Sequence, residues 1–128
     1  MGNGTAVQGR ATHVTVGSDR LPGTAGSPAE ARRFVAALAA ARGFDPEDAA
    51  LVASELATNA VEHARSSFLV EVSVTGPLLR IEVSDDSREP PALAAEDQWG
   101  LRIVEAVSRA WGCYPTTTGK TVWAELGE

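Results

Sequence analysis

The sequence predicts an α+β fold, in which helices cover one face of a mixed, mostly antiparallel sheet to form a two-layer sandwich. Two long segments in the first half carry apolar residues at helical spacing, and two segments after them alternate between apolar and polar residues. A third helical segment and two short alternating segments follow. Because helices and hairpins are segregated along the chain, the pattern favours an α+β class.

The first two helices have clear start and stop signals. Ser27 begins a Ser-Pro-Ala-Glu capping box with proline at the first helical position, and Gly43 suits the left-handed residue that ends a helix. Asp45 is the expected N-cap of the second helix, since Pro46 and two acidic residues follow it. We expect this second helix to run to about Arg65.

The remaining elements follow from alternation and from turn residues. They are, in chain order, a short edge strand over 13–16, a loop over 19–26, strands over Phe68–Thr75 and 79–84 joined by a turn at 76–77, a loop over 85–99, a helix that Gly100 opens and Trp111-Gly112 ends, and strands over 113–115 and 121–126 joined by a turn at 116–120. A loop as long as 85–99 is uncommon in a compact domain and is often functional.

Length and composition indicate one globular domain. The chain has 128 residues, of which 44% are hydrophobic, and many of these are alanines that allow close helix packing. We expect residues 1–12, which are Gly-rich and polar, to be a flexible N-terminal segment, and residues 13–128 to form the single domain.

Several classes of partner and site are disfavoured. The net charge is −6 and the basic residues are dispersed, so direct binding of nucleic acid is not expected. No run of about 20 apolar residues predicts a membrane span. Cys113 is the single cysteine, expected to be a small buried strand residue, and the two histidines have no zinc-ligand spacing. Without a disulfide framework, a cytoplasmic protein is expected.

The second helix carries an unusual row of polar side chains. Glu55, Asn59 and His63 follow one another at four-residue steps, so that neighbours lie about 40° apart around the helix. Apolar residues fill the adjacent sector: Val52, Leu56 and Ala60. A carboxylate and an amide oxygen so placed can hold a hard cation or orient a water or hydroxyl. The alternative is that the row is only the wet edge of an amphipathic helix.

Four segments together resemble a known superfamily. They are the helix segment 54–64 (Ser-Glu-Leu-Ala-Thr-Asn-Ala-Val-Glu-His-Ala), the strand end 83–85 (Val-Ser-Asp), the helix start 99–104 (Trp-Gly-Leu-Arg-Ile-Val) and the last strand from 119 (Gly-Lys-Thr-Val-Trp). This set and its order resemble the GHKL nucleotide-binding superfamily, with its histidine-kinase-like ATPase fold. The nearest branch is the bacterial, actinomycete-like anti-sigma-factor serine kinases. The resemblance extends over residues 27–126.

The resemblance implies a role for each polar residue of the helix. Asn59 would be the Mg²⁺ ligand, because its side-chain oxygen is a hard, neutral donor and the phosphates of ATP, with water, would complete the octahedron. Glu55, one turn earlier, would be the catalytic general base for an attacking water or serine hydroxyl. His63 occupies a common position of the same motif, where a structural role is expected from its closeness to the buried sector.

Further nucleotide contacts are implied by the other three segments. Asp85 would accept a hydrogen bond from the exocyclic amine of adenine, which guanine cannot supply at that place. Gly100 and Leu101, at a helix start, would offer backbone N–H groups to the phosphates. Thr121 would support Asp85 and a water beside the adenine. Taken alone, Asp85 and the Gly-Lys-Thr segment are ordinary turn residues.

The implied function is that of an ATP-binding regulatory protein. It would phosphorylate a serine of an anti-anti-sigma (STAS-type) partner, sequester a sigma factor, or do both, and homodimers are common in this family. The chain departs from the family pattern by replacing glycines and by lacking an arginine near the helix start: Ser87, Glu89, Glu96, Asp97 and Gln98 stand there, with Arg88 as the one basic residue. These departures keep open the alternative of a catalytically weak or inactive nucleotide-binding module that acts by partner switching.

Overall fold

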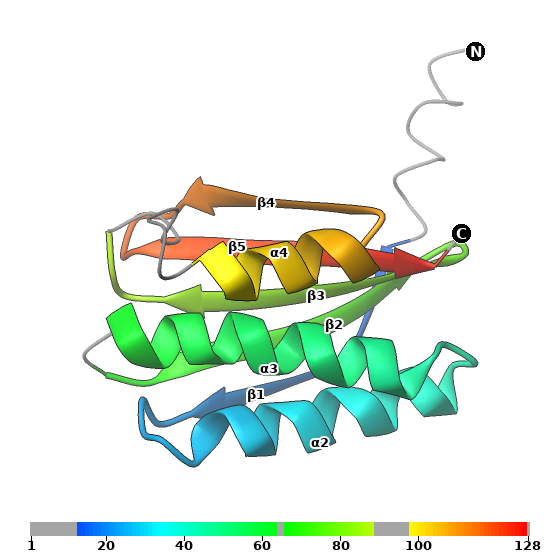
Figure 1. Cartoon of the computed structure of the whole chain (residues 1–128), viewed down its shortest axis with the longest axis horizontal. Coiled ribbons are helices and arrows are strands. Elements are labelled where there is room, and N and C mark those ends of the chain that lie inside the picture. The colour runs from blue at the N-terminus through cyan, green and yellow to red at the C-terminus, as the bar shows by residue number, and fades with distance from the viewer. Residues whose placement is uncertain (1–12, 64–65, 89–97, 128) are drawn as a thin grey trace, which may run out of the picture.

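The structure, a computed structural model, describes residues 13–63, 66–88 and 98–127 (Figure 1). The elements are β1 (His13–Leu21), α2 (Ser27–Ala41), α3 (Pro46–His63), β2 (Phe68–Thr75), β3 (Leu78–Asp85), α4 (Gln98–Val107), β4 (Ala110–Pro115) and β5 (Lys120–Gly127). The expectations for residues 1–12 and 89–97, Glu89, Glu96 and Asp97 included, lie outside the described residues.

The α+β two-layer fold is confirmed. The strands form one sheet in the order β1-β2-β3-β5-β4, and helices α2, α3 and α4 lie together on one of its faces (Figure 1). Each strand pairing in the described part of the chain is antiparallel, so the parallel pairs that a mixed sheet would contain are not found there. No helix of the described segments has the length and apolar content needed to cross a membrane.

The core lies between the helices and the inner face of the sheet. Alternation along β2 and β3 directs apolar side chains to this face, where they are fully or almost fully buried: Phe68, Val70, Val72, Leu79, Ile81 and Val83. Helix α3 meets them with small residues that have no exposed surface: Ala49, Ala53, Ala57 and Ala60. Such small side chains allow α3 to pack closely in the core.

The two predicted helix starts differ in outcome. At α3 the Oδ1 atom of Asp45 accepts a hydrogen bond from the backbone N–H of Glu47 at 2.9 Å, as expected for an N-cap. At α2 the predicted capping box is wrong, because the N-cap is Gly26 and makes no side-chain cap bond. Ser27 lies inside the helix, and its hydroxyl instead donates to the backbone carbonyl of Pro22.

Several strand and helix boundaries also differ from those predicted. Strand β1 continues through 19–21, a segment expected to be loop, because it pairs with β2 as far as Leu21. Helix α4 begins at Gln98 and ends at Val107, and β4 begins at Ala110. The backbone N–H of Arg109 already donates to the Glu125 carbonyl at 2.8 Å, so sheet pairing ends the helix before Trp111. Strand β5 begins one residue earlier than predicted, at Lys120.

Candidate functional site

A buried ion pair joins the end of β3 to the start of β5. Asp85 and Lys120 are directly opposite each other in the antiparallel register. The Lys120 Nζ lies 3.0 Å from Oδ2 and 3.1 Å from Oδ1 of Asp85, and the two side chains are only 3% and 1% exposed. The backbone N–H of Ser87 also donates to Oδ1 at 2.9 Å. Asp85 is therefore a fixed carboxylate with its charge balanced inside the protein.

The structure does not bring Thr121 to Asp85. Successive side chains of a strand point to opposite faces of the sheet. Asp85 and Lys120 lie on the face that the helices cover, in line with the buried Val122. The Thr121 hydroxyl lies 2.7 Å from the Ser84 hydroxyl on the opposite face. The side chain beside Asp85 is that of Lys120, and not the threonine that the resemblance implied.

Lys120 is the site residue that sequence reasoning missed. A signal for it was present, because Val122, Ala124 and Leu126 alternate toward the buried face of β5. One further step of two residues back along the strand reaches Lys120. Because the predicted strand begins at Thr121, Lys120 falls in the preceding turn, where the alternation assigns it to neither face of the sheet.

Helix α3 carries the other predicted site residues. Burial raises the pKa of Glu55 above its usual value, and the negative charge of Glu62 raises it further. The Nδ2 atom of Asn59 and the Nδ1 atom of His63 are buried, and neither has a hydrogen-bond partner within the described segments. Buried polar atoms are almost always paired in folded proteins, so this row has hydrogen-bonding capacity left for a ligand or water.

These residues come to one end of the molecule. Figure 1 shows the C-terminal half of α3, the end of β3, the start of β5 and the start of α4 at the same end of the sheet. Gly100 and Leu101 belong to the first turn of α4. The backbone N–H groups of a first helical turn have no partner within the helix, and the helix dipole makes them attractive to anions.

The side-chain chemistry fits a single Mg²⁺ contact rather than a metal site made by protein alone. The described residues contain no group of three or more histidine, cysteine, aspartate or glutamate side chains that could hold a metal ion. An amide such as that of Asn59 can supply one oxygen, and Mg²⁺ is commonly held by one or two protein oxygens together with phosphates and water. The buried atom of Asn59 that has no partner among the described residues is the amide nitrogen, a hydrogen-bond donor, so the binding of Mg²⁺ by the amide oxygen stays a prediction.

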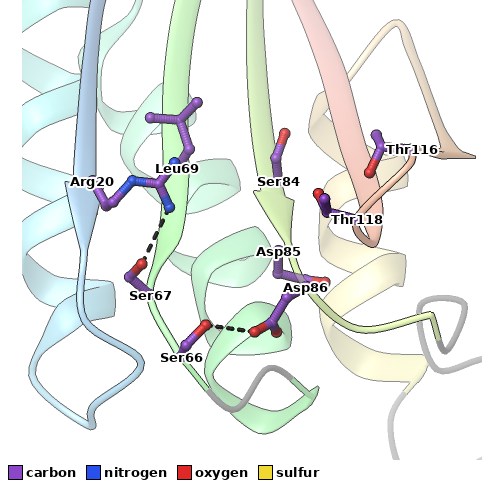
Figure 2. Close-up of a pocket in the computed structure, with 9 residues that line it drawn as sticks. All are labelled: Arg20, Ser66, Ser67, Leu69, Ser84, Asp85, Asp86, Thr116 and Thr118. Carbon is purple, nitrogen blue, oxygen red and sulfur yellow. Dashed lines mark hydrogen bonds between the residues drawn. The ribbon is translucent and has the colours of Figure 1, made fainter.

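A separate pocket of about 310 Å³ lies at the same end of the strands (Figure 2). Its described lining residues are Arg20, Ser66, Ser67, Leu69, Ser84, Asp85, Asp86, Thr116 and Thr118. Leu69 pairs with both Arg20 and Ser84 across the sheet, and these three side chains belong to the face opposite the helices. Neither Glu55 nor Asn59 lines this pocket, so we distinguish it from the α3 row.

Cys113 differs from its predicted environment. It lies in β4 as expected, but it is exposed instead of buried. Partial burial is the main cause that raises the pKa of the Cys113 thiol; the positive charge of Lys120 lowers that pKa, and the negative charge of Asp85 raises it. Cys113 pairs with Val122, which is two residues from Lys120 and on the same face of β5, so β4 places the thiol on the side of the sheet that carries the Asp85–Lys120 pair.

The turn before β5 leaves no room for a side chain at Gly119. A Cβ atom there would lie 1.9 Å from the Asp85 carbonyl oxygen and 2.7 Å from the Asp86 Cα. We expect Gly119→Ala to lower the free energy of unfolding by about 1–3 kcal/mol, because the backbone that holds Asp85 must shift. Urea unfolding measures this loss. Gly26→Ala is the control, since a Cβ there meets nothing within 4 Å; equal effects of both changes would contradict the prediction.

Comparisons with known proteins agree with the observed fold. The chain is similar to the crystal structure of the RsbU and RsbW domains of Rv1364c from Mycobacterium tuberculosis, with a TM-score of 0.65 and 23% sequence identity. That match covers 88% of this chain and 32% of the other, so this chain spans about a third of that protein's length. At this identity the likeness shows the fold alone. The comparison with curated proteins found no match.

The family model provides the more specific result. The model of the histidine kinase-like ATPase domain matches residues 21–125, from the end of β1 to the last residues of β5. This range contains the polar row of α3, the Asp85–Lys120 pair and the start of α4. It confirms the superfamily to which the four sequence segments pointed: the chain belongs to the histidine kinase-like ATPase domain family.

Proposed function

We propose that this domain binds ATP with Mg²⁺ as a cytoplasmic regulatory protein of the anti-sigma-factor kinase type. In this proposal it transfers the γ-phosphate to a serine of a small anti-anti-sigma (STAS-type) partner and sequesters a sigma factor. The observation that carries the proposal is that the elements with a fixed buried carboxylate, a buried amide and a helix start lie at the same end of the sheet. The resemblance of the four sequence segments to the anti-sigma-factor serine kinases supports the kinase branch.

Each part of the nucleotide would have its own contact. The Asp85 carboxylate would accept a hydrogen bond from the exocyclic amine of adenine, and the amide oxygen of Asn59 would hold Mg²⁺. The backbone N–H groups of Gly100 and Leu101 would donate to phosphate oxygens. Bound Mg²⁺ supplies neutralisation of phosphate charge. Because the chain has a net charge of −6, such local donors are needed to hold an anionic ligand.

Glu55 is the proposed general base. Its carboxylate would accept the proton of the partner's serine hydroxyl as the serine oxygen bonds to the γ-phosphorus and the bond from that phosphorus to the ADP oxygen breaks. Partial burial raises the pKa of Glu55, which makes the carboxylate a stronger base than one in open water. Positioning and charge neutralisation would provide most of the remaining rate enhancement.

A second candidate function has its own support. Arg88 is the one basic residue that the sequence places in the segment leading to α4, and its Nη2 atom donates to the Thr117 carbonyl at 2.7 Å. In this position the guanidinium group of Arg88 stabilises the turn between β4 and β5 and does not point toward a γ-phosphate. This contact favours a module that binds nucleotide, transfers phosphate slowly or not at all, and acts by partner switching.

Calorimetry with ATP, with and without Mg²⁺, tests the binding that both candidates share. We expect Asp85→Asn to weaken ATP binding on the order of 100-fold and to abolish thermal stabilisation by ATP, because the new amide group presents N–H donors to the amine of adenine. Asp19→Asn, an exposed change in β1, is the control and should bind like the unchanged protein. Retained ATP binding in the Asp85 variant would exclude base recognition by Asp85.

An assay with ATP labelled in its γ-phosphate distinguishes the two candidate functions. The kinase predicts that label from the γ-phosphate appears on a serine of the partner. Nucleotide binding without labelled partner would leave the partner-switching module as the function.

A further inference from the structure

We infer that Lys120 is the second half of a base-reading pair, donating a hydrogen bond to the ring nitrogen N1 of adenine while Asp85 accepts from the neighbouring exocyclic amine. This inference rests on the proposed function, since it concerns the same nucleotide. It adds a specificity residue that the sequence motifs did not indicate. Its basis is the contact between Asp85, at the end of β3, and Lys120, at the start of β5.

The pair retains hydrogen-bonding capacity after its internal contacts are counted. A carboxylate offers about four lone-pair sites, and Asp85 uses three of them, two toward Lys120 and one toward the Ser87 N–H. An ammonium group has three N–H donors, and the hydrogen bonds that Lys120 makes with described residues both go to Asp85. By this count, one acceptor site of Asp85 and one donor of Lys120 are not used by described residues.

Adenine has the complementary pattern. Its exocyclic amine is a donor and the adjacent N1 is an acceptor, so one edge of the base can satisfy the carboxylate and the ammonium together. Guanine carries a carbonyl oxygen at position 6 and an N–H at position 1. In the same pose it would set the carbonyl against the carboxylate and its N–H against the ammonium. Two mismatched buried contacts discriminate against guanine far more strongly than one mismatched contact does.

A purely structural role is a poor explanation for the burial of Lys120 at this place. Lysine is almost never fully buried unless its charge is paired, and the only lysine of this chain is 2% exposed and paired with Asp85. A buried ion pair is often no more stabilising than apolar residues of similar volume, which would continue the inner row of Val83 and Val122. A charged pair at the end of that row is better explained by a ligand that uses the charge.

Nucleotide analogues test the inference on the unchanged protein. Calorimetry should show that 1-deaza-ATP, which lacks the N1 acceptor, binds about tenfold or more weakly than ATP, since a hydrogen bond to a charged donor is lost. The control is 7-deaza-ATP, which keeps the edge that the pair would read and should bind within about twofold of ATP. GTP should bind at least about 100-fold more weakly.

A spectroscopic signal and a variant provide the second line of the test. Because Lys120 is the only lysine, ¹⁵N-lysine labelling gives a single side-chain Nζ signal. ATP should shift that signal, whereas 1-deaza-ATP should shift it much less. In Lys120→Met, ATP and 1-deaza-ATP should bind equally; if this variant does not fold, the analogue series on the unchanged protein decides.

The outcomes distinguish a failure of the proposed function from a failure of this inference alone. If ATP does not bind the unchanged protein, the proposed function fails and the inference falls with it. If ATP binds and 1-deaza-ATP binds equally well without a difference in the Nζ signal, the inference alone is overturned and Lys120 has a structural role.

Discussion

Lys120→Met is expected to lower the free energy of unfolding by about 3–5 kcal/mol, the usual cost of removing one partner of a buried ion pair. The Asp85 carboxylate is 1% exposed in the pair, and Lys120 is the counter-charge that contacts it. Without Lys120, the carboxylate stays buried with no charge to balance it, or the end of β3 must open to water. Urea unfolding of the two proteins measures the loss.

Two further variants show whether burial is the cause. The double variant Asp85→Leu with Lys120→Met replaces both charges by apolar groups and should recover most of the stability. Glu125→Gln removes a charge from the Arg80–Glu125 pair, which is partly exposed on the open face of the sheet, and should cost less than about 1 kcal/mol. A loss below 1 kcal/mol for Lys120→Met would show that water reaches the pair.

Glu55→Gln is expected to reduce phosphoryl transfer by about 10²–10⁴-fold while leaving ATP affinity nearly unchanged, because the amide keeps the shape of the side chain and cannot take up a proton. Turnover is measured as labelled partner per unit time, and affinity by calorimetry. An equal loss of binding and turnover would show that Glu55 has a structural role, and unchanged turnover would exclude it as the base.

The pH dependence of turnover adds an independent check. Burial, followed by the charge of Glu62, raises the pKa of Glu55, so the base becomes protonated and turnover falls as the pH drops through that raised pKa. Glu62→Gln removes the second cause and should move this acid limb to lower pH. Because folding raises this pKa, the folded protein binds the proton more tightly than the unfolded chain. Its stability therefore gains as the pH falls through the raised pKa, a gain that Glu55→Gln should remove.

The elements that could be predicted are those whose signals lie within a few neighbouring residues. The periodicity of α3 and the alternation of β2 and β3 placed these elements correctly, and the Asp45 cap formed as expected. Local signals failed where a tertiary contact was stronger. Ser27 has the sequence of a helix cap, but its hydroxyl bonds to the Pro22 carbonyl. The sequence places the end of the third helix at residues 111–112, but pairing with β5 makes 110–112 part of a strand.

The polar row of Glu55 and Asn59 is determined by the sequence alone, since residues four apart on one helix must share a face. The partner of Asp85 was decided only by the tertiary structure, because the two strands that carry Asp85 and Lys120 meet through pairing across 35 positions of the chain. A shift of one residue in that register would turn Lys120 outward and Thr121 inward. The packing of the inner face of β5 against the helices fixes the register, and thereby gives the site a lysine.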